Sequence, residues 1–204
     1  MGATGEHDFA GLDAAARRLV WIVVAIHAGT ALLLLATGRL ADSQAMQADA
    51  LDFLAFGASY GVSLWAVGQP KERRLGAGLV KAAALFVFGI WIAVTTLYQF
   101  FTRDVPEAEI MALVGLVALG ANGLTLYLLE AQRAGDKRLG AIWLAARNDM
   151  IGTGAVMVAA GLVALLNAST PDLVVAGVMV VLFLTGAYQA LRQSFAEWQA
   201  GREP

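Results

Sequence analysis

The sequence predicts an all-α, polytopic membrane protein with six transmembrane helices and with both termini in the cytoplasm. The chain of 204 residues is 59% hydrophobic and only 15% charged, whereas soluble domains are about 45–50% apolar and about 25% charged. The apolar residues gather in long runs, and the basic residues gather in every second loop between these runs. The mean hydropathy of +0.67 agrees with a chain whose solvent is a lipid bilayer.

Each predicted helix is an apolar stretch of about 20 residues or more, which is the length that a bilayer core of about 30 Å requires. In order along the chain, the spans are residues 19–38, 46–67, 76–100, 109–130, 139–166 and 172–191. The charges and turn formers between them lie at residues 39–42, 69–74, 102–107, 132–138 and 169–172. We therefore expect a cytoplasmic segment at residues 1–18, a transmembrane domain at 19–192 and a short cytoplasmic tail at 193–204.

Lysine and arginine residues set the predicted orientation, because they are enriched in cytoplasmic loops. The basic residues on one side are Arg17, Arg18, Lys71, Arg73, Arg74, Arg133, Lys137, Arg138, Arg192 and Arg202. The opposite loops contain only two arginines beside five acidic residues. The N-terminal segment lacks the basic start and cleavage site of a signal peptide, so we expect the first span to be retained. We expect an integral protein of a bacterial inner (cytoplasmic) membrane.

The composition and the motifs exclude several function classes. The chain contains no cysteine, which excludes disulfides, thiolate metal sites and thiol chemistry. Its net charge of −2 gives no reason to expect nucleic acid as a partner. It contains no Walker A sequence, nucleophile elbow or HExxH motif, so we do not expect an enzyme or a tightly bound cofactor. The loops leave no room for a nucleotide-binding domain, so any transport is expected to be secondary.

Acidic residues inside the predicted spans are the strongest functional candidates, because an ionised side chain there costs about 2.5–3.5 kcal/mol. At a rise of 1.5 Å per residue, Asp149 lies roughly 16 Å from the cytoplasmic end of its span. Asp52 lies about 10 Å from the outer end of its own span, so the two can share a level. Asp49 shares a helix face with Asp52, and Asn122 lies about 12 Å into the fourth span. Such a cluster suits a hard divalent cation or a proton.

The same residues also have structural explanations. Asp52 could form an ion pair with Lys81 or Arg147, and Asp149 could form one with Lys81. Lys81 could instead extend toward the cytoplasmic surface, since its long side chain can bury its stem and keep its charge in water.

Three further polar positions have similar alternatives. Asp49 could face water at the outer rim of the membrane. Asn122 could hold two helices together by hydrogen bonding, which is worth about 0.6–2 kcal/mol. His27 is more often a packed and hydrogen-bonded core histidine than a metal ligand.

Two of these segments resemble motifs of the cation diffusion facilitator (cation efflux) family. Residues 43–56 read SQAMQADALDFLAF and resemble the family's second span, where an alanine–aspartate–alanine stretch leads into a metal motif of two ligands four residues apart. Residues 139–156 read LGAIWLAARNDMIGTGAV and look like the fifth span, where a second such motif precedes a glycine. Residues 121–129 fit the family's asparagine-containing fourth span. The chain looks like a short form that lacks the cytoplasmic C-terminal domain.

The resemblance implies a six-span homodimer that exports a divalent cation (Mn²⁺, Fe²⁺, Co²⁺, Zn²⁺ or Mg²⁺) in exchange for protons. The site would have four ligands between the second and fifth spans. Carried over to this sequence, Asp52 and Asp149 are two of the four ligands. Phe56 and Ala145 occupy the positions of the other two.

Three further side chains could complete a metal site around these two carboxylates, namely Asp49, Asn148 and Asn122. Such an oxygen-rich site would favour Mg²⁺ or Mn²⁺ over Zn²⁺. The two missing ligands leave a second hypothesis open, in which the chain is a degenerate relative that does not transport. It would then be an accessory or structural subunit of a larger membrane complex. In both cases we expect membrane lipids as partners.

Overall fold

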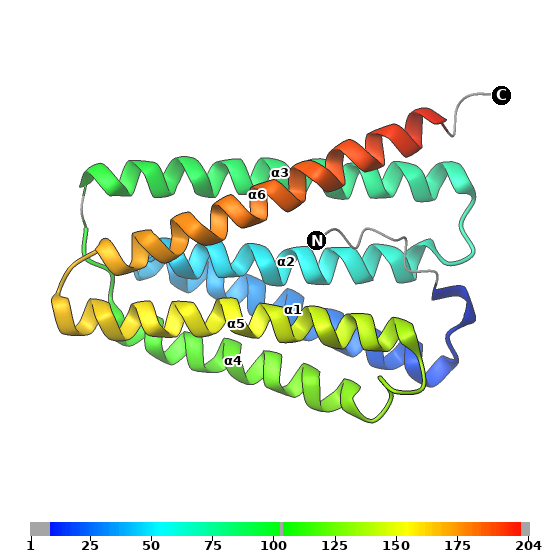
Figure 1. Ribbon diagram of the computed structural model, residues 1–204, viewed down its shortest axis with the longest axis horizontal. Coiled ribbons are helices and arrows are strands. Elements are labelled where there is room, and N and C mark those ends of the chain that lie inside the picture. Colours follow the sequence, from blue (N-terminus) through cyan, green and yellow to red (C-terminus); the bar gives the residue numbers. More distant parts are fainter. Residues whose placement is uncertain (1–8, 103, 201–204) are drawn as a thin grey trace.

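The computed structural model describes residues 9–102 and 104–200, and these residues form six long α-helices (Figure 1). The helices are α1 (Ala14–Leu40), α2 (Gln44–Ala66), α3 (Lys71–Thr102), α4 (Ala108–Glu130), α5 (Lys137–Leu166) and α6 (Thr170–Ala200). A short 3₁₀ helix, η1 (Phe9–Gly11), precedes them, and no strand occurs among the described residues. The predicted all-α fold with six long helices is confirmed.

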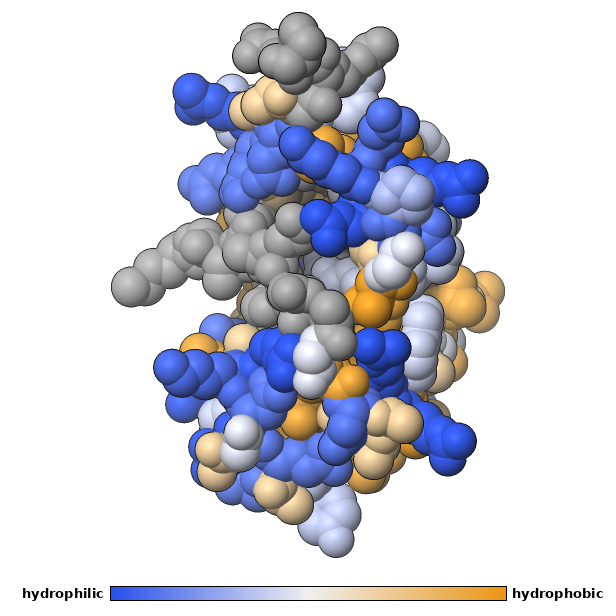
Figure 2. Space-filling model, turned by 90° about the vertical axis from the view of Figure 1, so that its right-hand side faces the viewer, coloured by the Kyte–Doolittle hydropathy of each residue, from blue (hydrophilic) through white to orange (hydrophobic). Residues whose placement is uncertain are grey.

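The helices alternate in direction, so their ends collect at two ends of the bundle (Figure 1). The end that we term the basic end contains the start of α1, the α2–α3 and α4–α5 loops and the end of α6. The opposite end, termed the acidic end, contains the α1–α2, α3–α4 and α5–α6 loops. Figure 2 looks onto the basic end, where hydrophilic residues cover much of the visible face. This arrangement agrees with the alternating charge of the loops.

Helix α2 differs from the other five helices because its apolar stretch falls short of what a membrane span requires by composition. The other five are long and apolar enough to cross a membrane by length and composition. With 23 residues, α2 is about 35 Å long and therefore also long enough. It packs against α1, α3, α5 and α6, and its polar residues Gln44, Gln47 and Asp49 are buried. Because α2 is largely enclosed by other helices, these side chains face protein rather than lipid.

Several helices continue beyond the predicted spans at the basic end. Helix α1 begins at Ala14 rather than at residue 19, and α6 ends at Ala200 rather than at residue 191. The side chain of Asp13 caps the start of α1, since its Oδ1 accepts a hydrogen bond of 2.7 Å from the backbone N–H of Ala16. A helix satisfies its own backbone hydrogen bonds, so it can extend from lipid into water when its side chains become polar.

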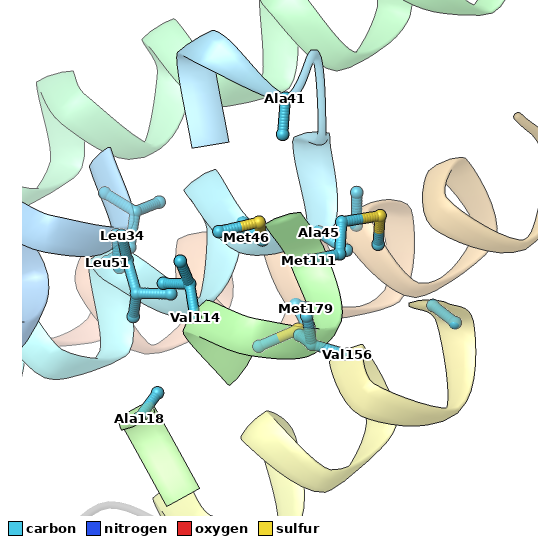
Figure 3. Packing of buried hydrophobic residues seen from close by; sticks show 14 of the residues in the cluster. Leu34, Ala41, Ala45, Met46, Leu51, Met111, Val114, Ala118, Val156 and Met179 are labelled. Carbon is cyan, nitrogen blue, oxygen red and sulfur yellow. The ribbon is translucent and has the colours of Figure 1, made fainter. Parts of the chain in front are cut away.

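The buried apolar residues form two clusters along the bundle. The cluster nearer the acidic end includes Leu34, Met46, Met111, Val156 and Met179, from five different helices (Figure 3). The cluster nearer the basic end is formed mainly by η1 and by the adjoining parts of α1, α2, α4 and α5. In α1, α4 and α5 the buried polar residues lie between these two clusters. The candidate site is therefore in the middle of the bundle.

Candidate cation site

A cavity of about 340 Å³ lies between α2, α3, α5 and α6. Its lining extends from Asp52 and Asp149 to Arg74 and Glu197 near the basic end. At 1.5 Å per residue, Asp149 is about 18 Å from the start of α5 and Asp52 is about 21 Å from the end of α2. The two carboxylates therefore lie at similar depth, and the cavity connects them with the basic end.

The four positions that the sequence resemblance assigns to the two metal motifs all line this cavity. Asp52 and Phe56 come from α2, and Ala145 and Asp149 come from α5. Each pair is separated by four residues, which places both members on one face of their helix. The ring of Phe56 is stacked on the imidazole of His27, with centroids 3.7 Å apart and an interplanar angle of 11°.

Neither Asp52 nor Asp149 forms an ion pair with a basic side chain in the part of the chain that the structure describes. Lys81 lines the same cavity but does not form an ion pair with either carboxylate. Arg147 is exposed on α5, and its guanidinium carbon lies 5.8 Å from the ring centroid of Trp143. The alternative of structural ion pairs with Lys81 or Arg147 is therefore not found.

Asp49 belongs to a buried chain of hydrogen bonds that joins α2, α5 and α4. The Oγ1 of Thr153 lies 3.1 Å from Asp49 Oδ1 and 3.3 Å from the backbone oxygen of Asp149, so its one proton serves one acceptor at a time. The Nδ2 of Asn122 donates to Thr153 Oγ1 at 3.2 Å. Asp49, Asn122 and Thr153 are all fully buried. Asp49 therefore does not face water at the membrane rim, and Asn122 does connect two helices.

Asp49 and Asp52 both approach α5 near Gly152. A Cβ atom on Gly152 would lie 3.7 Å from Asp52 Oδ2 and 3.9 Å from Asp49 Oδ1. Gly152 is one turn beyond Asp149 on the same helix face, and all three carboxyl groups are close enough to interact as charges. In residues 9–102 and 104–200, no three His, Asp or Glu side chains meet closely enough to hold a metal ion as they stand.

Several polar atoms of this region have no hydrogen-bond partner in the described structure. They are Asp49 Oδ2, Asp149 Oδ2, Asn122 Oδ1 and His27 Nε2. A buried polar atom without a partner costs about 1–3 kcal/mol. The two carboxylate oxygens are therefore available to a cation, a proton or water.

The structure separates the five candidate ligands into three groups. Asp52 and Asp149 line the cavity, whereas Asp49 and Asn122 belong to the buried hydrogen-bonded chain. Asn148 is exposed, because consecutive residues of an α-helix point about 100° apart and Asp149 faces inward. The structure does not bring Asn148 to the other four candidates.

His27 is a packed core histidine. It is fully buried, and its Nδ1 lies 3.0 Å from the backbone oxygen of Val23. The rings of Phe53 and Phe56 lie against it, and the side chain of Asn122 is close to its imidazole. His27 is absent from the lining of the cavity.

Residues 20–197 match the model of the cation efflux transmembrane domain. The chain belongs to the cation efflux family. The match begins in α1 and ends in the last turns of α6, so it includes all six helices. Proteins of this family transport cations across membranes rather than catalyse reactions. Comparison with curated proteins gives no match.

The start of α2 in this cation efflux protein is held by Asp172, a residue whose role was not predicted from the sequence. Asp172, near the start of α6, is fully buried and accepts a hydrogen bond of 2.6 Å from Ser43 Oγ. It also accepts hydrogen bonds from the backbone N–H groups of Gln44, at 2.8 Å, and Ala45, at 3.2 Å. N–H groups in the first turn of a helix have no acceptor within that helix. Asp172 provides the acceptor from another helix and therefore caps α2.

The cation efflux protein also has a polar contact between α2 and α3 at the acidic end. The Nε2 of Gln44 donates to Gln99 Oε1, and the Nε2 of Gln99 donates to the backbone oxygen of Asp42. The Oε1 of Gln44 accepts a hydrogen bond of 3.1 Å from Thr95 Oγ1. Together with the Asp172 cap, these bonds fasten the start of α2 to α3 and α6.

The two ends of the bundle therefore differ in their access to Asp52 and Asp149. A second cavity, of about 420 Å³, lies at the acidic end and includes Gln44 and Gln47 in its lining. Neither Asp52 nor Asp149 lines this second cavity. In this conformation, the cavity that contains the carboxylates extends toward the basic end of the cation efflux protein.

Proposed function

We propose that this protein transports a divalent metal cation and that Asp52 and Asp149 bind it. The proposal depends on one observation, which is that two carboxylates from different helices line one central cavity and that neither forms an ion pair with a described basic residue. Two ionised carboxylates in a region of low dielectric repel each other and are poorly solvated. A divalent cation between them would neutralise both charges, whereas a monovalent cation would neutralise only one.

We infer that the cation is a hard one, Mg²⁺ or Mn²⁺, rather than Zn²⁺. The cavity lining offers carboxylate, hydroxyl and amide groups, and none of its described residues is a histidine or a cysteine. Hard divalent cations prefer oxygen ligands and commonly retain water molecules. A cavity of about 340 Å³ has room for such waters beside two protein ligands.

The expected direction is export in exchange for protons. By the positive-inside rule, the basic end faces the cytoplasm, so the cavity in this conformation would receive the cation from that side. A carboxylate binds either a proton or the cation with high affinity, but not both at once. Protons that arrive from the acidic end would therefore release the cation on the opposite side of the membrane.

Transport in proteoliposomes tests this function. The purified protein is reconstituted with a Mn²⁺-sensitive dye inside, and Mn²⁺ uptake is followed with and without a pH gradient. We expect uptake by the wild type and a loss of at least about tenfold in Asp52→Asn and in Asp149→Asn. Asp104→Asn is the matched control, because Asp104 is exposed at the acidic end and outside the central cavity.

Two results would contradict the proposal. Uptake by the wild type no faster than that of empty liposomes would exclude transport of Mn²⁺, and the same outcome with Mg²⁺ and Zn²⁺ would exclude the function. Undiminished uptake in both aspartate variants would exclude the site.

One observation favours a second function, in which the protein is an accessory subunit that does not transport. Phe56 and Ala145 occupy two of the four motif positions in the cavity, and the Phe56 ring is held in place by its stacking on His27. Under this hypothesis, the protein would co-purify in fixed ratio with another membrane complex and would bind no metal. Isolation as a homodimer that binds Mn²⁺ would exclude it.

A further inference from the structure

Lys81 shares the cavity with the two carboxylates. It is the eleventh residue of α3, so its backbone is about 15 Å from the start of that helix at the basic end. The corresponding depth of Asp149 is about 18 Å, so Lys81 is slightly nearer the mouth of the cavity. A lysine carries its ammonium on a flexible four-carbon stem, so the charge can move within the cavity.

The charged residues of the cavity fall into two groups. Arg74 and Glu197 lie near the basic end, at the first turn of α3 and the last turn of α6. Asp52, Asp149 and Lys81 lie deeper, so Lys81 is the cationic residue of the lining that is nearest in depth to the two aspartates. No described carboxylate forms an ion pair with Lys81, so its positive charge acts on the cavity as a whole.

We propose that Lys81 is a resident cation that competes electrostatically with the transported cation and sets the affinity of the site. This inference rests on the proposed function. The ammonium partly balances Asp52 and Asp149 across the cavity when the site is empty, and it repels a divalent cation that enters. The site therefore binds its substrate less tightly than two free carboxylates would, which favours release.

The same charge contributes to selectivity. A monovalent cation brings no more charge than the ammonium already supplies, whereas a divalent cation brings twice as much. A divalent ion that takes the place of the ammonium therefore neutralises more of the carboxylate charge than the ammonium did. A monovalent ion neutralises only as much.

Calorimetric titration of the full-length protein with Mn²⁺ tests the role of Lys81. Lys81→Met retains a long side chain without its charge, and Lys81→Arg retains the charge. Arg73→Gln is the matched control, because Arg73 is exposed on the same helix and does not line the cavity. We expect the Kd for Mn²⁺ to fall about tenfold in Lys81→Met, because the removal of one positive charge from a water-containing cavity removes repulsion of that order for a divalent ion. Lys81→Arg and Arg73→Gln should bind as the wild type does.

The possible outcomes separate this inference from the proposed function. If Lys81 had only a structural role, Lys81→Met would bind Mn²⁺ more weakly, so its Kd would rise instead of fall. An unchanged or larger Kd overturns the inference about Lys81 but leaves the proposed function in place. If Lys81→Met does not elute as a folded protein, Lys81→Gln provides the same test with a different neutral side chain. If neither the wild type nor the neutral variants bind Mn²⁺, Mg²⁺ or Zn²⁺, the proposed function fails, and the inference fails with it.

Discussion

Removal of the Asp172 carboxylate should destabilise the protein more than removal of any exposed acidic residue at the same end. Asp172 is fully buried and accepts three hydrogen bonds at 2.6, 2.8 and 3.2 Å. Two of the donors are backbone N–H groups of the first turn of α2, and they have no alternative acceptor within their own helix. The third donor, Ser43, also accepts a hydrogen bond of 3.1 Å from the backbone N–H of Met46.

The expected magnitude follows from these three bonds. A buried donor that loses its acceptor costs about 1–3 kcal/mol, and the loss of a helix cap costs about 0.5–2 kcal/mol. The cavity at the acidic end is lined by Gln44, so water can reach part of the turn once the cap is removed. We therefore expect a loss of about 3 kcal/mol for Asp172→Ala. Asp172→Asn retains one acceptor oxygen and should lose about half as much.

Thermal unfolding in detergent, followed by tryptophan fluorescence, measures this effect. A loss of about 3 kcal/mol corresponds to a fall of about 6–12 °C in Tm for a chain of this size. Asp104→Asn is the control, because Asp104 is an exposed acidic residue at the same end. A Tm for Asp172→Ala equal to that of Asp104→Asn would refute the cap.

Two other predictions concern helix packing and pH. Gly89→Ala should destabilise the protein by about 1–3 kcal/mol, because its Cβ would lie 2.7 Å from a leucine methyl of α6. Gly120→Ala has no atom within 4 Å of the new Cβ and should leave Tm unchanged or slightly higher. The hydrogen-bonded guanidinium of Arg138 lowers the pKa of Asp136 below its ordinary value of 3.8. The ionised carboxylate therefore contributes its full stabilisation above about pH 4, and this stabilisation is lost as the pH falls through the lowered pKa. The difference in Tm between wild type and Asp136→Asn should be constant from pH 5 to 8 and should shrink only in stronger acid.

Much of the fold could be predicted from the sequence because the length of an apolar run is a local property. Each of the six predicted spans lies within, or within two residues of, a helix of the structure. The helix ends at the basic side could not be predicted in the same way, because hydropathy marks where lipid ends and not where a helix ends. The polar character of α2, with Asp49 and Asp52, has its explanation in the four helices that pack around it.

The candidate site could be predicted only in part. Depth arithmetic along two helices was sufficient to place Asp52 and Asp149 at one level, since the rise per residue is fixed. The exposure of Asn148 could have been anticipated from helical phase, since it is adjacent to an inward-facing aspartate. The cap that Asp172 provides could not, because its hydrogen-bond partner Ser43 is 129 residues away in the sequence. A contact of that kind depends on the packing of α6 against α2, which no local pattern encodes.

The most direct test of the central claim is anomalous diffraction from crystals of the full-length protein grown with Mn²⁺. We expect an anomalous peak in the central cavity, with carboxylate oxygens of both Asp52 and Asp149 at about 2.0–2.6 Å from the ion. Anomalous density that occurs only at the acidic end, or a central cavity that remains without density at saturating Mn²⁺, would contradict the account.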